Sequence, residues 1–227
     1  MVKVLFAKTL RDSRTQIVGW GIGIGSLLVL ALIVYPSIAS DYGDMIGQFP
    51  EAMRAFMGSE SSFDSLEGYL NVEFMSYAPM ALAIFAILSG TAIIVVEEKA
   101  GTLDLILAHP VSRLRLFLVK LVGLVMANAM IVCILLTMFW LPMPFLDVEI
   151  KAGRVMIALT LLWPYLTTIS FLSVLLSLLL SSRLFAGTIM AVLLVTSYIL
   201  DSLSNLVPVL EPLRPALLTT YYQKTKN

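Results

Sequence analysis

The chain offers few residues for catalytic chemistry. His109 is the only histidine among 227 residues, so neither an H-E-x-x-H motif nor a three-histidine metal site can form. A phosphate-binding G-x-x-x-x-G-K-[ST] loop is also missing from the sequence. Ser26, Ser89 and Ser173 have no neighbouring base to activate them and are interpreted as interhelical hydrogen-bond donors. The sequence therefore predicts no catalysis by this chain and no metal or cofactor bound to it.

Charged and helix-capping residues gather instead in one segment, EEKAGTLDLILAHPVSRLRLFLVK, which covers residues 97–120. Gly101 breaks the preceding apolar helix, and Thr102 can cap a new one. Asp104 follows in the first turn, where the helix dipole favours an acid. Pro110 ends this helix after about seven residues. The pattern predicts a short, rigid helix between two apolar runs.

One side of this short helix is apolar, because Leu103, Ile106 and Leu107 follow the i, i+3, i+4 spacing. Charged residues flank it: Glu97, Glu98, Arg113 and Arg115. An amphipathic helix of this kind suits docking in the groove of a soluble partner. It equally suits lying on the membrane surface.

Five apolar runs surround and follow this segment. Hydrophobic residues make up 59% of the chain and charged residues 13%, with a mean hydropathy of +0.94. A helix that crosses the roughly 30 Å hydrocarbon core of a bilayer needs about 20 such residues. The predicted spans are 17–38, 74–96, 116–141, 155–180 and 184–200. The sequence therefore predicts an all-α polytopic membrane protein.

Basic residues decide the expected orientation, because Lys and Arg close to the spans stay on the cytoplasmic side. With the N-terminus inside, nine of the 15 basic residues fall on inner segments, against four of the 15 acidic ones. The inner basic residues are Lys3, Lys8, Arg11, Arg14, Lys99, Arg113, Arg115, Lys120 and Arg183. We therefore expect a multi-pass protein of the cell (plasma or inner) membrane, with its N-terminus and the 97–115 segment in the cytoplasm.

The segment before the first span carries an apolar and a basic face, with Val4 and Leu5 on one and Lys8 and Arg11 on the other. Such a helix suits the inner headgroup layer as an interfacial elbow. The same basic residues also suit a role in orientation alone. The first apolar run is longer than the core of a signal peptide, so we expect it to remain as a span.

Four glycines open the first span as two overlapping small-xxx-small pairs. One pair is Gly19 with Gly23, and the other is Gly21 with Gly25. Such pairs let another helix backbone come close, which is a usual basis of packing in lipid. That helix belongs either to the same chain or to a second copy.

The polar residues inside the spans have two alternative roles. They line a substrate pathway, or they join helices to one another. They are Asn128, Thr137, Thr167, Thr168, Ser170, Ser173, Ser177, Thr196 and Ser197. Residue types alone name no substrate.

The central segment also resembles a known family. The run from Glu98 to Leu107, followed by PVSR at 110–113 and by Lys120, is similar to the pattern E-x-x-x-G-T-L-x-x-L-L-x-x-P-V-S-R of the permease subunits of ABC-2 type ATP-binding-cassette transporters. The N-terminal FAKTLRD at 6–12 and the GYL at 68–70 are similar to that family as well. The resemblance covers most of the chain and is strongest in the central segment.

The resemblance implies a single transmembrane permease domain over residues 1–227, in a family whose members have six spans. It also implies that the central segment holds a coupling helix, which docks on a separate ATPase subunit carrying ATP and Mg. The coupling residues it implies are Glu97, Glu98, Gly101, Thr102, Leu103, Asp104, Ile106, Leu107, Pro110, Val111, Ser112 and Arg113. Its implied partners are an ABC ATPase subunit, a second identical or different permease subunit and the lipid bilayer, without nucleic acid.

The expected function is ATP-driven export of a substrate through a dimer of such permease subunits. Transporters driven by protons or sodium usually carry ionisable groups inside the membrane. The five predicted spans contain no acid and no histidine at mid-depth, which favours an external source of energy. The alternative from another class is a non-transporting membrane scaffold or a regulatory subunit, because five spans are predicted where the family has six.

Overall fold

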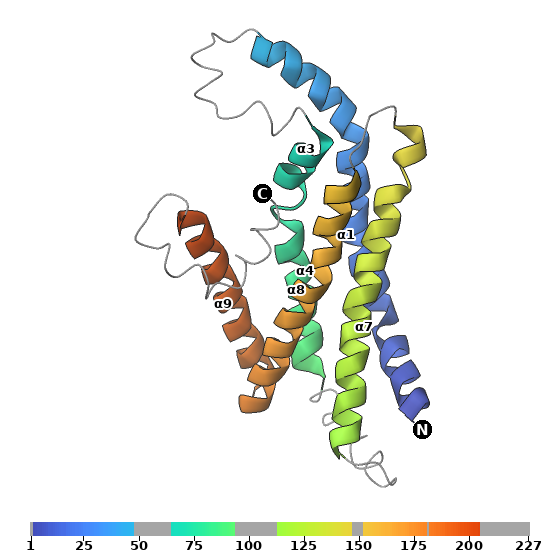
Figure 1. Cartoon of the computed structure of the whole chain (residues 1–227). Coiled ribbons are helices and arrows are strands. Elements are labelled where there is room, and N and C mark those ends of the chain that lie inside the picture. Colours follow the sequence, from blue (N-terminus) through green and yellow to red (C-terminus); the bar gives the residue numbers. More distant parts are fainter. Residues whose placement is uncertain (1, 48–64, 94–112, 147–151, 181, 205–227) are drawn as a thin grey trace.

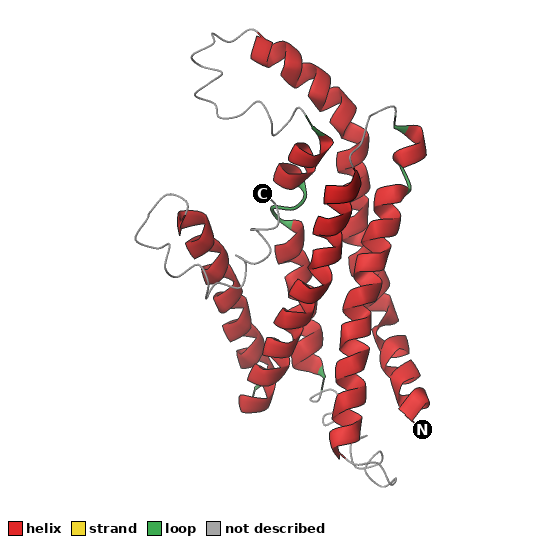
Figure 2. Cartoon of the chain, in the orientation of Figure 1, coloured by secondary structure: helices red, strands yellow, loops and turns green. Residues whose placement is uncertain are grey.

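A computed structural model gives the structure, and it describes residues 2–47, 65–93, 113–146, 152–180 and 182–204. Over these ranges the chain forms helices joined by turns, without a strand (Figure 2). The elements are α1 (Val2–Gly47), α3 (Leu66–Glu73), α4 (Ala78–Ala92), α7 (Arg113–Trp140), the 3₁₀-helix η2 (Met143–Phe145), α8 (Ala152–Leu179) and α9 (Arg183–Ser204). The predicted all-α fold is confirmed.

Three of the five predicted spans agree closely with helices in position. Four helices are long and apolar enough to cross a membrane, and there are up to five if the bent pair α3 and α4 counts as one span. The starts and ends of α7, α8 and α9 all lie within four residues of the predicted third, fourth and fifth spans. A multi-pass membrane protein therefore follows from both the sequence and the fold.

The second span differs from its prediction because it is broken. Its helix α4 has 15 residues, which gives about 22 Å at 1.5 Å per residue and falls short of a bilayer core. The preceding α3 is capped by the Ser65 hydroxyl and ends at Phe74, and the two helices meet at an angle of 48°. Phe74, where the sequence placed the start of the second span, instead lies at the break, and Pro79, a residue expected to bend this span, lies in the first turn of α4.

The N-terminal elbow helix predicted from the sequence is not a separate element. Helix α1 runs unbroken for 46 residues, or about 69 Å. The physical reason is that residues 2–16 contain neither Gly nor Pro, so no residue there ends the helix before the apolar run begins. The basic N-terminal turns are thus a rigid extension of the first span.

The helices alternate in direction along one bundle (Figure 1). The N-terminus, the last turn of α4, the first turn of α7 and the turn between α8 and α9 lie together at the lower end in this view. We call this the N-terminal end of the bundle. Helix α1 packs mainly along α7, α4 along α8, and α9 against α4 and α8.

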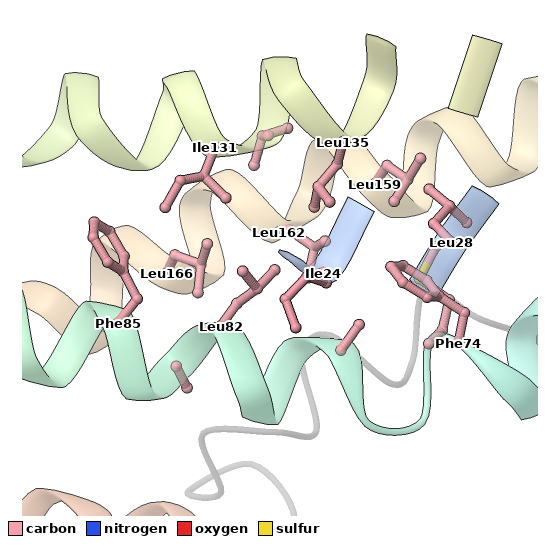
Figure 3. Close-up of a cluster of buried hydrophobic side chains, with 14 of the residues drawn as sticks. Ile24, Leu28, Phe74, Leu82, Phe85, Ile131, Leu135, Leu159, Leu162 and Leu166 are labelled. Carbon is pink, nitrogen blue, oxygen red and sulfur yellow. The ribbon is translucent and has the colours of Figure 1, made fainter. Parts of the chain in front are cut away.

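The buried core is apolar and draws on α1, α3, α4, α7, α8 and α9, and Figure 3 shows part of it. Leu28, Leu82, Leu135 and Leu162 are each fully buried in it. The outward faces of the same helices are also apolar and carry many exposed Leu, Ile, Val and Phe side chains. Because lipid tails are as apolar as leucine, close packing and interhelical hydrogen bonds must hold such a bundle together.

Candidate functional site: the end of α4

The predicted coupling segment falls almost entirely in residues 94–112, which lie outside the described residues. The predicted residues outside them are Glu97, Glu98, Gly101, Thr102, Leu103, Asp104, Ile106, Leu107, Pro110, Val111 and Ser112. Of the predicted set, Arg113 is the first residue of α7, directly after the serine predicted to cap that span. What the structure describes is how the two flanking helix ends are held.

A lysine joins these two helix ends. Lys120, two turns into α7, donates a hydrogen bond from Nζ to the main-chain carbonyl of Ile93 at the end of α4, at 2.6 Å. Its side chain is 9% exposed. A buried ammonium costs free energy unless its protons are accepted, so this carbonyl contributes to holding Lys120 in place. The residues that lead into and out of the 94–112 segment are thereby fixed to one another.

Two further side chains reach the same helix end from other helices. Ser177 on α8 donates to the carbonyl of Thr91 at 3.2 Å, and Arg183 at the start of α9 donates to the carbonyl of Leu88 at 3.2 Å. We call Lys120, Ser177 and Arg183, together with the carbonyls that they contact, the α4 clamp. Through it, α7, α8 and α9 all hold the last turns of α4.

The chemistry of the clamp follows from the physics of helix ends. The last carbonyls of a helix, here those of Thr91 and Ile93, lack a main-chain partner within it and carry a partial negative charge; the carbonyl of Leu88, one turn earlier, also accepts a bond from the Thr91 hydroxyl at 3.3 Å. Cationic side chains from neighbouring helices satisfy that charge best. Near lipid, where water competes little, such bonds are costly to leave unmade. The arrangement is suited to holding α4 in register with its neighbours.

The two glycine pairs on α1 face different surroundings. A Cβ atom added at Gly21 would lie 2.7 Å from Cδ1 of Ile134, and one at Gly25 would lie 2.8 Å from Cγ of Met138. Around Gly19 and Gly23, leaving aside the nearby backbone of α1 itself, no atom of the described residues lies within 4 Å of such a Cβ. Gly21 and Gly25 therefore pack on α7 of the same chain, while Gly19 and Gly23 face open space on the outside of the bundle.

A polar contact joins α7 and α8 at mid-depth. Asn128 is fully buried and donates from Nδ2 to the hydroxyl of Ser170 at 3.1 Å. On the other side of Ser170, its main-chain oxygen lies 2.5 Å from where a Cβ at Gly90 would be. Nearby, Trp163 donates from Nε1 to the carbonyl of Val125 at 3.1 Å. These contacts support the packing role for this part of the polar set.

Other polar residues of that set bond within their own helices. Thr137 and Thr168 are exposed, and each donates to the carbonyl four residues earlier. Ser26 donates to Gly23 and Ser173 to Ile169, in both cases on the same helix. The predicted interhelical role was therefore wrong for these two serines, since hydroxyl groups in helices often bond back to the preceding turn.

Sequence reasoning missed the clamp. In the sequence, Lys120 belongs to the family-like pattern and to the basic residues expected on the inner side, and Arg183 belongs only to the latter. Ser177 belongs to the polar residues that suit either a substrate pathway or helix packing. The available signal was a lysine one to two turns inside an apolar run, where a charge needs a specific partner. Among the described residues, no group of three or more His, Cys, Asp or Glu is placed to hold a metal ion.

Comparison with known proteins places the chain in a family. The model of the ABC-2 family transporter proteins matches residues 4–214. No curated protein and no solved structure matches the chain. Because the match covers nearly the whole sequence, the chain belongs to the ABC-2 family of transporters. It is a membrane permease of an ABC transporter, and the resemblance drawn from the central segment is confirmed.

Proposed function

We propose that this chain is the membrane-spanning permease subunit of an exporter, driven by ATP that a separate ATPase subunit hydrolyses on the cytoplasmic side. The ATPase docks on the 97–115 segment through the apolar side of the coupling helix. The observation that carries the proposal is the G-T-L pattern of the family between the ends of α4 and α7. The clamp at these ends supports it, because a docked partner needs a firm attachment to the membrane helices.

The energy source agrees with this assignment. The sequence has no phosphate-binding loop, so in this proposal ATP and Mg are held by the partner and the chain binds no cofactor itself. In the spans, Asp201 lies at the far end of α9, 18 residues or about 27 Å after Arg183. That position is remote from mid-depth, where the coupling acids of ion-driven transporters usually lie.

The orientation in this proposal has the N-terminal end of the bundle in the cytoplasm. Helix α1 brings Lys8, Arg11 and Arg14 to that end, and α7 brings Arg115 and Lys120 (Figure 1). At the opposite end, Arg154 pairs with Glu67 at 3.6 Å, so that basic residue is partly neutralised. Basic residues therefore concentrate where the rule for membrane proteins expects the cytoplasm.

A second permease subunit is part of the proposal, and the open pair Gly19 and Gly23 is the surface that we assign to it. The matching pair, Gly21 and Gly25, is already occupied by α7. Small residues allow the backbones of two helices to approach closely in lipid. Each half of the transporter is then the whole chain, acting as one permease domain.

Co-purification tests the docking. A Leu103→Glu variant places a charge on the apolar side of the predicted coupling helix, and we expect it to lose the ATPase subunit while still inserting into the membrane. Leu105→Glu is the matched control, because two residues along a helix turn about 200° away from that side. Retention of the ATPase by Leu103→Glu, at the level of the control, would contradict docking at this segment.

A further inference from the structure

The α4 clamp ties a short helix to three others at the point where α4 leads into the 94–112 segment. It uses side chains from three different helices, each on a different carbonyl of α4: Leu88, Thr91 and Ile93. Two of the donors are cations, and the third is a hydroxyl group. A short helix with a break at its other end, between α3 and α4, depends on such contacts for its position.

The rest of α4 has the form of a lever. At its far end the 48° break separates it from α3, and along its length Gly90 lies directly against the main chain of α8. This close contact lies in the last turn of α4, so α8 packs tightly against the same end of α4 that the clamp holds. Through the clamp, α7 and α9 are also tied to the last turn of α4.

We propose that Lys120, Ser177 and Arg183 are positioning residues that make α4, α7, α8 and α9 move together when the ATPase displaces the 94–112 segment. This inference rests on the proposed function for its driving force, while the clamp contacts lie within this chain and do not depend on the partner. Lys120 keeps α4 and α7 from separating under load. Ser177 and Arg183 carry the displacement of α4 to α8 and to the start of α9.

Arg183 differs from the other two clamp residues, Lys120 and Ser177, in its exposure and in the helix that it connects. It is the first residue of α9 and is partly exposed, so replacing it leaves no buried charge behind. Helix α9 contacts only α4 and α8 substantially among the described helices. The bond to Leu88 is therefore a direct route from the end of α4 to α9.

The first measurement asks whether the clamp holds α4 to α7 in the chain alone. Spin labels at Leu88→Cys and Leu118→Cys, both exposed side chains, report the distance between the two helices. The free Cys133 is first replaced by serine. We expect one narrow distance in the parent and in Lys120→Arg, and a broadened distribution in Lys120→Met. An unchanged narrow distance in Lys120→Met overturns the clamp.

The second measurement asks whether the clamp transmits movement. Labels at Leu30→Cys on α1 and Leu193→Cys on α9, both exposed, are followed in the complex with the ATPase before and after addition of MgATP. We expect MgATP to shift this distance in the parent and in Arg183→Lys. In Arg183→Gln the shift is lost, while the ATPase subunit stays bound and the rate of ATP hydrolysis stays within about twofold.

The outcomes separate the two proposals. A full MgATP-driven shift in Arg183→Gln overturns the transmission role even where the first measurement finds the clamp intact. If the parent chain neither binds the ATPase nor responds to MgATP, the proposed function fails, and the transmission role fails with it. In that case the first measurement still decides whether Lys120 fixes α4 to α7. A purely structural role would change the resting distance without changing the MgATP-driven shift, which also counts against transmission.

Discussion

Lys120 and Ile93 are 27 residues apart in sequence, yet the Lys120 Nζ lies 2.6 Å from the carbonyl oxygen of Ile93. These residues stand on either side of the segment that carries the family pattern. One hydrogen bond thus closes the base of that segment at the membrane. The bond links the end of α4 directly to α7, which is the contact on which the proposed joint movement of these two helices depends.

The two glycine pairs of α1 should respond differently to the same change. Gly21→Leu would overlap Ile134 on α7, and we expect it to lower the free energy of unfolding by about 1–3 kcal/mol. Gly19→Leu is the control, with open space around it and an expected effect below about 0.5 kcal/mol. Reversible unfolding of the monomer in mixed detergent micelles measures both. Equal losses for the two variants would contradict the assigned packing of α1 on α7.

Substitution in the outward pair, Gly19 and Gly23, tests the pairing of two permease subunits separately from the folding of one. We expect Gly23→Leu to leave the unfolding of the monomer unchanged but to weaken pairing of two permease subunits, because its site faces outward. Mass measurement by light scattering in detergent, across a range of protein concentrations, reports this pairing. A Gly23→Leu variant that pairs as well as the parent would show that the second subunit packs elsewhere.

Gly90 should tolerate no side chain. A Cβ there would lie 2.5 Å from the main-chain oxygen of Ser170, and a backbone atom cannot move aside as a flexible side chain can. We expect Gly90→Ala to destabilise the chain by about 1–3 kcal/mol. Gly187→Ala, whose Cβ would meet Ile87 at 3.9 Å, is expected to change stability by less than about 0.5 kcal/mol. Thermal unfolding in detergent compares the two, and equal midpoints would refute the close approach of α4 and α8.

The bond between Asn128 and Ser170 should be measurable as a coupling. We expect a double-mutant cycle of Asn128→Leu and Ser170→Ala to give an interaction free energy of about 0.6 kcal/mol, with about 1.7 kcal/mol as the upper bound for such pairs in membranes. The cycle removes the hydrogen bond of 3.1 Å seen between them. Strictly additive effects of the two substitutions would mean that this bond contributes nothing to stability.

The orientation can be tested with two exposed residues at opposite ends of the bundle. Phe145 is 86% exposed next to the end of α7, and Leu184 is 83% exposed at the start of α9. In a Cys133→Ser background, we expect a membrane-impermeant maleimide added outside intact cells to label Phe145→Cys and to spare Leu184→Cys. Labelling of Leu184→Cys alone would place the N-terminal end of the bundle outside the cell.

Sequence reasoning predicted the helices well, because the length of an apolar run is nearly sufficient to define a span. It did not place the break after α3, since hydropathy continues through the residues Phe74 to Tyr77; the local signal for a bend in this span is Pro79, which lies in the first turn of α4. It also left open which glycine pair faces α7. Both faces of these helices are apolar, so hydrophobicity does not separate a lipid-facing side from a packed one.

The clamp was harder to predict for a related reason. Its acceptors are main-chain carbonyls of Leu88, Thr91 and Ile93, and any residue type supplies such a group. A sequence therefore shows the donors without their partners. Lys120 stands out as a charge in an apolar run, but only the arrangement of α4 beside α7 and α8 identifies what it contacts.

Reconstitution with the ATPase subunit tests the central claim most directly, which is that this permease receives work from a partner docked on the 97–115 segment. The rate of ATP hydrolysis is measured for the ATPase alone, with the parent chain, and with Leu103→Glu in vesicles. We predict that the parent chain raises the rate at least about fivefold and that Leu103→Glu returns it to the level of the ATPase alone. An identical rate in all three samples would contradict the claim and favour a non-transporting scaffold.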